Sequence, residues 1–148
     1  MSQPLRLGIA GLGTVGIGVL RIIRKHADLL AARTGREIVI SALCARDRSK
    51  DRGVPLDRYG WESDPVALAT RDDVDVFVEL IGGDEGPAKV AVEAALATGK
   101  DVVTANKALL AIHGQSLAEL AEKHGRSLRY EAAVAGGIPV IKALTEGL

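Results

Sequence analysis

Hydrophobic residues recur along the chain in short runs that alternate between the period of a strand and that of a helix. Leu5, Leu7 and Ile9 occupy every second position, which predicts a first strand. From Thr14 the apolar spacing lengthens and predicts one helix that ends near Gly35. The apolar face predicted for this helix comprises Val15, Val19, Ile22 and Ile23.

The same alternation continues to the end of the chain. The predicted buried strands cover residues 38–43, 74–81, 102–105 and 128–132. The predicted helices cover residues 66–69, 88–98 and 116–124, with a further helix after Pro139. Residues 59–62 are a candidate short edge strand. Such alternation is typical of a parallel sheet covered by helices, so we predict an α/β fold for residues 1–148: a Rossmann-like, doubly wound parallel sheet with helices on both faces.

The composition narrows the classes of function. The 148 residues suit one domain, and the 19 Lys and Arg balance the 19 Asp and Glu, which disfavours nucleic-acid and membrane-surface partners. No apolar run approaches the roughly 20 residues of a membrane span, and no signal-peptide pattern follows Met1. The lone Cys44 excludes an internal disulfide and suits a reducing compartment. We expect a cytoplasmic protein with no membrane or nucleic-acid partner.

Three glycines follow the first strand in the pattern Gly11-x-Gly13-x-x-Gly16 and open the first helix. In this context Gly11 permits a tight turn, Gly13 lets a pyrophosphate approach the backbone, and Gly16 lets helix and strand pack closely. The free N–H groups at the helix start then face the phosphates. The pattern predicts dinucleotide binding, and the alternative is a glycine-rich turn without a ligand.

The end of the second strand bears on the choice of cofactor. An Asp or Glu at this position favours NAD, because it accepts a hydrogen bond from the ribose 2′-hydroxyl. Here the position holds Arg46, with Arg48 and Lys50 nearby, and these cations suit a 2′-phosphate. We therefore predict a preference for NADP, with use of NAD left open. The alternative is a solvated loop, because Asp47 and Asp51 offset part of this charge.

Ligands in open α/β sheets bind beyond the carboxyl ends of the strands. Besides the glycine turn, three loops are predicted there, and they comprise Gly82-Gly83, residues 104–107 and residues 131–139. Lys107 follows a strand directly, so its ammonium group is a candidate for stabilising an alkoxide or transferring a proton. The alternative is a lysine at the start of an exposed helix. For Glu131, near the end of the last predicted strand, the simpler interpretation is a carboxylate that caps the next turn. For Glu79, the simpler interpretation is a carboxylate that accepts hydrogen bonds from nearby backbone donors.

Four segments together resemble the nucleotide-binding half of homoserine dehydrogenase: G-L-G-T-V-G, V-E-L-I-G-G, T-A-N-K-A-L-L-A and Y-E-A-A-V-A-G-G-I-P-V-I. They occur in the order of that family, and the resemblance covers residues 5–148. It implies a reversible NAD(P)-dependent reduction of L-aspartate 4-semialdehyde to L-homoserine. That reaction is a step towards threonine, methionine and isoleucine.

The resemblance also implies roles for individual residues. Lys107 matches a lysine with a catalytic part beside the nicotinamide, and Arg46 matches the residue that reads the adenosine end. The cofactor-binding positions become Gly11, Leu12, Gly13, Thr14, Val15, Gly16, Arg46, Gly82, Thr104 and Lys107. The implied site for a monovalent cation, usually sodium, comprises Glu131, Val134, Gly136 and Ile138, and oxygen ligands suit such a hard ion.

The sequence departs from this family in one respect. The family has a second domain that supplies most substrate contacts and a dimerising sheet, and that domain is absent from these residues. We therefore expect cofactor binding from the chain but not full turnover, and a homodimer or larger oligomer for the parent enzyme. Two alternatives remain: a related amino-acid or aldehyde dehydrogenase, and a stand-alone NAD(P)-binding or redox-sensing module.

Overall fold

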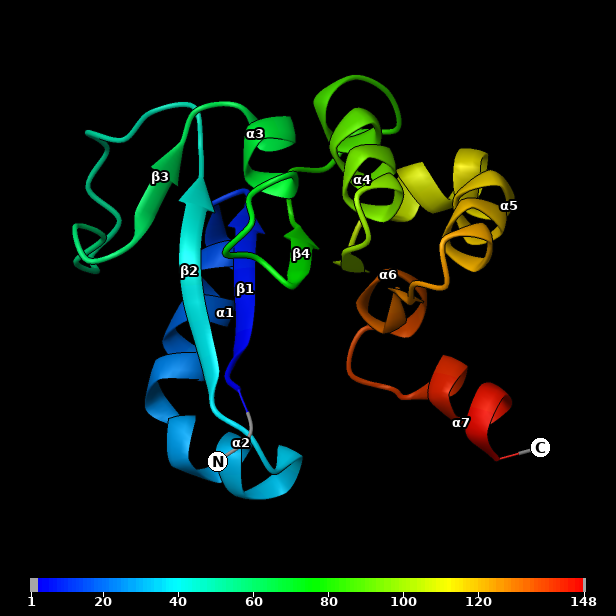
Figure 1. The fold of residues 1–148 in the computed structure, drawn as a ribbon, viewed down its shortest axis with the longest axis horizontal. Helices are drawn as coiled ribbons and strands as arrows, with labels where there is room; N and C mark the ends of the chain where they lie inside the picture. The colour runs from blue at the N-terminus through cyan, green and yellow to red at the C-terminus, as the bar shows by residue number, and fades with distance from the viewer. Residues whose placement is uncertain (1–2, 148) are drawn as a thin grey trace.

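A computed structural model describes residues 3–147, and within them one parallel sheet forms the centre of the fold (Figure 1). Its strands are β1 (Leu5–Ala10), β2 (Ile38–Cys44), β3 (Gly60–Glu62), β4 (Val76–Glu79), β5 (Asp101–Thr104) and β6 (Leu128–Arg129). The spatial order is β3-β2-β1-β4-β5-β6, and every neighbouring pair is parallel. The predicted doubly wound sheet is confirmed, and β3 confirms the candidate edge strand.

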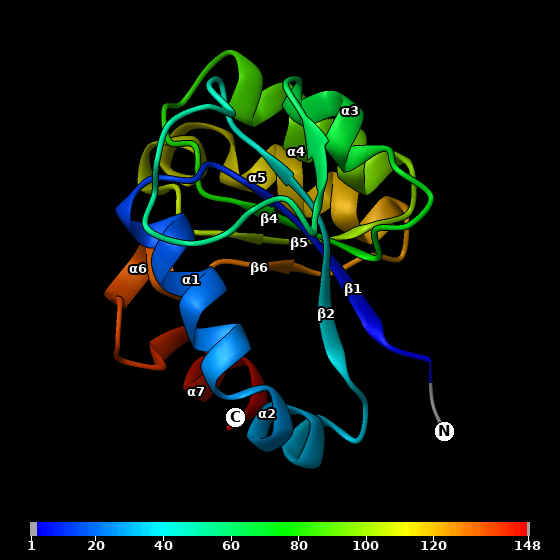
Figure 2. The same cartoon turned by 90° about the vertical axis from the view of Figure 1, so that its left-hand side faces the viewer.

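Helices lie on both faces of this sheet (Figure 2). They are α1 (Thr14–Lys25), α2 (Ala27–Thr34), α3 (Pro65–Ala69), α4 (Pro87–Ala97), α5 (Lys107–Lys123), α6 (Glu131–Ala135) and α7 (Val140–Glu146). On one face α3, α4 and α5 cover a core that includes Phe77 and Val102. On the other face α1 covers a second core that includes Ile9 and Leu43. Burying an apolar side chain of this size stabilises the fold by about 1.5–3 kcal/mol.

The first helix differs from its prediction in two ways. It is interrupted at His26, so that α1 and α2 replace one continuous helix, although the predicted end at Gly35 is confirmed by a left-handed φ of 72°. The buried face of α1 is formed by Gly16, Ile17 and Leu20, whereas Val15 is 58% exposed. The cause is the glycine turn, because Gly16 must face the turn it packs against and thereby fixes the rotation of the helix.

Two further boundaries were predicted wrongly. Helix α5 begins at Lys107, nine residues before the predicted start at 116, because the Asn106 side chain accepts a hydrogen bond from the Leu109 N–H and caps the helix. Strand β6 ends at Arg129, so Glu131 is the first residue of α6 and does not end a strand. Strand β6 lies at the edge of the sheet and pairs only with β5, so no second neighbouring strand stabilises a longer extended segment.

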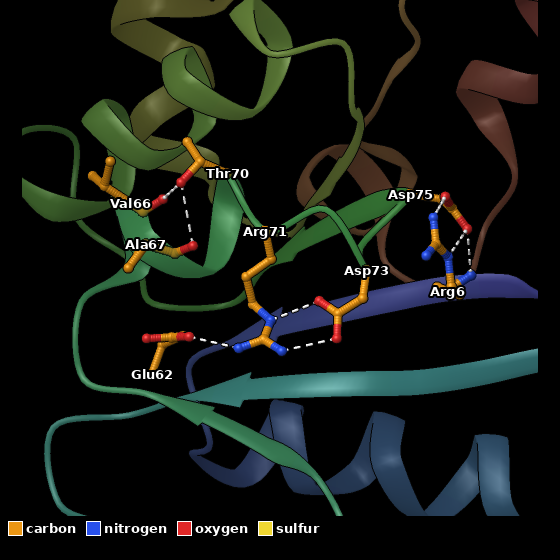
Figure 3. Close-up of polar contacts among 8 residues, drawn as sticks. All are labelled: Arg6, Glu62, Val66, Ala67, Thr70, Arg71, Asp73 and Asp75. Carbon is orange, nitrogen blue, oxygen red and sulfur yellow. Dashed lines mark hydrogen bonds and ion pairs between the residues drawn. The ribbon is translucent and has the colours of Figure 1, made fainter.

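Ion pairs hold the chain between β3 and β4 (Figure 3). Arg71 donates to Glu62 at 2.6 Å and to both carboxylate oxygens of Asp73, while Arg6 of β1 donates to both oxygens of Asp75. We call these five residues the ion-pair cluster. Their side chains are 27–46% exposed, so the cluster lies at the surface.

Candidate functional site

The candidate site lies where the strand order reverses. Strands β1 and β4 are neighbours, but the chain leaves β1 towards β2 on one side and β4 towards β5 on the other. Ligands of doubly wound folds bind at such a switch point, beyond the carboxyl ends of the strands. At this edge Gly11 donates its N–H to the Cys44 carbonyl, and Leu80 donates to the Ala10 carbonyl. These contacts bring the ends of β1, β2 and β4 together.

The three glycine positions of the turn differ in whether the fold leaves room for a β-carbon. Gly11 has a φ of 98°, and a β-carbon there would collide with the Leu80 carbonyl. A β-carbon on Gly16 would collide with the Gly11 carbonyl, so only glycine allows α1 to approach β1 this closely. Gly13 has an ordinary extended backbone and no atom within 4 Å of a built β-carbon. The fold therefore needs Gly11 and Gly16, whereas nothing among residues 3–147 requires a glycine at position 13.

Beside this turn is a cavity of about 570 Å³, within the usual range for small-molecule sites. Its lining comes from the glycine turn, the loop after β2, the start of α3 and the loop after β4. The structure thereby brings together four of the predicted cofactor residues, which are Gly11, Leu12, Gly13 and Arg46. Thr14 and Val15 follow directly as the exposed first residues of α1.

The loop after β2 supplies most of the charge in this cavity. Arg46, Asp47, Lys50 and Arg52 all line it. The Asp47 carboxylate accepts hydrogen bonds from the backbone N–H and the hydroxyl of Ser49, and these bonds lower the pKa of Asp47. Arg46 is exposed and has no ion pair or hydrogen bond to any residue in the described part of the chain. The loop therefore offers an uncommitted cation, while its nearest carboxylate is already engaged.

Arg52 is a site residue that our sequence analysis missed. Its guanidinium donates to the carbonyls of Leu12, Asp47 and Lys50, at 3.2, 2.7 and 2.9 Å, and also lies over the Trp61 ring. It therefore ties the loop after β2 to the glycine turn. No local sequence pattern predicts this role, because Arg52 and Leu12 are forty positions apart in the sequence and meet only when the loop folds back onto the glycine turn.

Cys44 also lines the cavity but is not a reactive group. It is 4% exposed, and burial raises the pKa of its thiol to about 11. A thiol with such a pKa stays protonated and is a poor nucleophile at neutral pH. Cys44 therefore serves as a small buried side chain of the core.

A hydrogen-bonded network joins the ends of β4 and β5. The Glu79 carboxylate is fully buried and accepts from the Ile81 and Gly82 N–H groups and from the Thr104 hydroxyl. The Thr104 oxygen in turn accepts from the Asn106 N–H, and the Asn106 amide donates to the Gly83 carbonyl. We call Glu79, Thr104 and Asn106, with these main-chain partners, the carboxyl-end network. The expectation that Glu79 accepts from backbone donors is confirmed.

Lys107 follows this network directly as the first residue of α5. Its side chain is exposed and does not line the 570 Å³ cavity. Because β5 lies next to β4, Lys107 begins one strand further from β2 than the loop that holds Gly82. The structure thus places the predicted catalytic lysine and the predicted Arg46 on opposite sides of the glycine turn.

The residues predicted to hold a cation lie in α6 and the turn after it. The Glu131 carboxylate accepts from the Lys142 backbone N–H at 3.2 Å, and the Ile138 carbonyl accepts from Val140. Carboxylate and carbonyl oxygens have the chemistry that a hard monovalent ion prefers. Among residues 3–147 no three His, Cys, Asp or Glu side chains gather as a metal cluster, so any site here depends on main-chain carbonyls.

No helix in that same range is long and apolar enough to cross a membrane.

The chain is similar in sequence to known proteins of one family. Residues 11–131 match the family model described as the NAD binding domain of homoserine dehydrogenase. A homoserine dehydrogenase of Neisseria gonorrhoeae is 49% identical over 146 residues, which are 99% of this chain and 33% of that protein. One of Bacillus subtilis is 41% identical and is covered to 34%.

A solved structure agrees with the fold. The homoserine dehydrogenase of Thiobacillus denitrificans superposes with a TM-score of 0.90 at 42% identity, over 99% of this chain and 34% of that one. The chain thus spans about a third of the length of these relatives. With the family model matching most of its residues, the chain belongs to the homoserine dehydrogenase family and corresponds to its NAD-binding domain.

Proposed function

We propose that this chain is the cofactor-binding part of an NAD(P)-dependent enzyme that interconverts L-homoserine and L-aspartate 4-semialdehyde. The relatives named above are homoserine dehydrogenases, which supports this activity and substrate pair. The bound nicotinamide supplies the hydride chemistry, and the protein contributes position and electrostatics. Because the chain corresponds to about a third of those relatives, we assign it cofactor binding rather than complete turnover.

The observation that carries the proposal is the open space at Gly13. Its backbone conformation suits any residue, and no atom of the described part of the chain lies within 4 Å of where its β-carbon would be, yet it lines the cavity. A glycine that the fold does not need is explained by a ligand that occupies the space. A pyrophosphate at the N-terminus of α1 fits this position, because unpaired N–H groups and the helix dipole favour an anion there.

Alanine substitutions test this directly. We expect Gly13→Ala to weaken NADPH binding by about tenfold or more, as measured by calorimetric titration, without lowering the stability of the chain. The matched control is Gly18→Ala, where a β-carbon also meets no atom within 4 Å, but which lies further along α1 and does not line the cavity. Equal NADPH affinity in the wild type and Gly13→Ala would remove the glycine turn as the pyrophosphate site.

We propose NADP as the preferred cofactor, with Arg46 binding the 2′-phosphate. The support is chemical: Arg46 and Lys50 line the cavity, and Asp47 is engaged by Ser49 and so is less available to a ribose hydroxyl. A guanidinium binds phosphate through strong, charge-assisted hydrogen bonds. The expected result is tighter binding of NADPH than of NADH.

The control for Arg46→Ala is Arg48→Ala. Arg48 is also an exposed arginine of this loop, but it lies over the Trp61 ring and does not line the cavity. Arg46→Ala should abolish the preference for NADPH over NADH, while Arg48→Ala should keep it. If both variants kept the preference, another cation would have to read the phosphate.

We further propose that Lys107 is the catalytic lysine, acting beside the nicotinamide on the reacting oxygen. Its position after the end of β5 and its free, exposed ammonium group support this role. In the whole enzyme, Lys107→Ala should lower turnover by about a hundredfold or more with unchanged NADPH affinity. Lys123→Ala, at the other end of α5, is the control and should leave both quantities unchanged.

A sodium ion bound through Glu131, Val134, Gly136 and Ile138 is also a proposal. A cation that binds only the folded chain raises its stability, and the gain grows with the logarithm of the cation concentration once that exceeds the dissociation constant. Thermal unfolding in sodium chloride and in choline chloride of equal ionic strength measures this effect. Stabilisation specific to sodium that disappears in Glu131→Gln would support the site, and equal stability in both salts would exclude it.

A further inference from the structure

We propose that Glu79 is a positioning residue, whose buried carboxylate sets the relative geometry of the Gly82 turn and the start of α5. Through these two segments it would shape the nicotinamide end of the cofactor site. The inference rests on the function proposed above, and Glu79 itself need touch neither substrate nor cofactor.

The position of the nicotinamide end follows from the fold. The adenosine end belongs at the loop after β2, where Arg46 lies, and the pyrophosphate belongs at the glycine turn between β1 and α1. A dinucleotide crosses the switch point, so its other end lies on the far side of β1. That side is formed by the carboxyl ends of β4 and β5, where Glu79 and Thr104 are register partners.

The contacts show that one carboxylate serves both loops. One oxygen of Glu79 accepts from the N–H groups of Ile81 and Gly82, at 2.7 and 3.0 Å, and fixes the turn after β4. The other oxygen accepts from the Thr104 hydroxyl at the end of β5. The two loops therefore cannot shift independently while Glu79 keeps all of its partners.

The network continues to the first turn of α5. The Thr104 hydroxyl uses its hydrogen towards Glu79, which leaves its oxygen free to accept from the Asn106 N–H at 3.0 Å. Asn106 then caps α5 through Leu109 and donates to the Gly83 carbonyl at 2.6 Å. Each donor has one acceptor and the direction of every bond is set. The start of α5, and hence Lys107, is tied to the Gly82 turn.

Burying the Glu79 carboxylate costs free energy that a purely structural residue at the end of a strand would not require. Glu79 is 0% exposed, and its partners are neutral donors rather than a cation. A buried carboxylate is tolerated only when hydrogen bonds replace its hydration, and an apolar residue such as the preceding Val78 would avoid the cost. What the carboxylate adds is a fixed geometry of two loops that an apolar side chain cannot direct.

The test uses Thr104, because its hydroxyl is the link between Glu79 and the Asn106 N–H at the start of α5. The family resemblance implies Thr104 as a cofactor-binding position, but its side chain is 1% exposed and its hydroxyl is engaged by Glu79 and Asn106, so we treat its effect on the cofactor as indirect. Thr104→Val keeps the shape and removes both the donor to Glu79 and the acceptor of the Asn106 N–H. Thr104→Ser restores a hydroxyl for both bonds, and Glu79→Gln alters the acceptor alone. The matched control is Thr98→Val, at a threonine whose hydroxyl bonds only to carbonyls of α4.

Two ligands separate the ends of the site: NADPH, and adenosine 2′,5′-bisphosphate as the adenosine half alone. We expect Thr104→Val and Glu79→Gln to weaken NADPH binding by about tenfold, and Thr104→Ser by no more than about twofold. Binding of the bisphosphate should be unchanged in all variants. In NMR spectra, the amide resonance of Gly82 should move in Thr104→Val, although it belongs to the other loop, and stay in place in Thr98→Val.

Three results would overturn the inference. Unchanged NADPH affinity in Thr104→Val would do so, as would equal weakening of both ligands, which indicates general damage to the fold. A Gly82 resonance that ignores Thr104 would also do so, because it shows that the loops are not coupled. If the wild-type chain bound neither ligand, the proposed function would fail first and the inference with it.

Discussion

Strand β4 has a carboxylate at each end, and the two are held in opposite ways. Asp75, just before the strand, accepts from the Arg6 guanidinium, and the two side chains are 36% and 38% exposed. Glu79, the last residue of the strand, is fully buried and accepts from main-chain N–H groups and one hydroxyl. The same chemical group is therefore neutralised by a cation in water at one end and by neutral dipoles in the core at the other.

The difference separates stability from geometry. Exposed ion pairs adjust their side chains freely and contribute about 0–1 kcal/mol each, so the ion-pair cluster fastens the chain without fixing it tightly. The bonds that Thr104 makes to Glu79 and to Asn106 are buried, so no water replaces a lost partner and these donors must keep their positions. We infer that the edge which holds the candidate site is also the edge where displacement is most costly.

The largest effect expected from this comparison is at Glu79. Glu79→Ala leaves the buried Thr104 hydroxyl and two part-buried N–H groups without their acceptor, and should lower the free energy of unfolding by about 3 kcal/mol. Asp75→Ala should cost much less, because water replaces the lost partner. Urea unfolding followed by circular dichroism measures both, and similar losses would erase the contrast between the two ends.

A smaller effect is expected in the backbone of the same edge. Gly82 has a φ of 86°, so Gly82→Ala should cost about 1–2 kcal/mol from strain alone, although no atom crowds its β-carbon. Gly18→Ala in α1 is the matched substitution without that φ and should instead stabilise the chain by up to about 1 kcal/mol. The same urea titration compares them. Loss of stability in both variants would mean that the cost is not backbone strain.

The ion-pair cluster should show a weaker effect that depends on salt. Arg71→Met removes the bonds to Glu62 and Asp73 and should cost about 1 kcal/mol at low ionic strength. In about 1 M sodium chloride, where the Debye length is about 3 Å, this loss should shrink. The loss in Glu79→Ala should not respond to salt, because its partners carry no charge. A salt response at Glu79 and none at Arg71 would reverse our assignment.

The smallest expected effect concerns acid. Hydrogen bonds from Arg71 and Arg6 lower the pKa of Asp73 and of Asp75 in the folded chain. Such groups stabilise fully above their unfolded pKa of about 3.9, and the stabilisation is lost as pH falls through the lower folded pKa. The double variant Asp73→Asn, Asp75→Asn should therefore lose less stability than the wild type from about pH 5 to pH 3. Urea midpoints across this range test it, and parallel slopes would contradict it.

The fold was largely predictable because its strongest signals are local. The alternating Leu5, Leu7 and Ile9 and the glycine turn predicted β1 and the start of α1 correctly, and Gly35 predicted the end of α2. The errors arose where tertiary contacts decide. The rotation of α1 depends on how Gly16 packs against the glycine turn, and nothing in the spacing of Val15 and Ile22 shows it.

The candidate site was less predictable for the same reason. The glycine turn has a pattern, but Arg52 acts on Leu12 across forty positions, and the bond between Glu79 and Thr104 joins two separate strands. One missed feature had a local signal. Asn106 is a favourable N-cap residue ahead of a run of helix formers, so the start of α5 was available from the sequence.

The position of Arg52 has a consequence for redesign of cofactor preference. Because its guanidinium donates to the carbonyls of Leu12, Asp47 and Lys50, the loop after β2 cannot be exchanged independently of Arg52. A transplant of residues 46–50 from an NADH-specific protein would lose its anchor unless Arg52 stayed compatible with it. A change of this loop, by design or by evolution, therefore has to include residues 46–50 and Arg52 together.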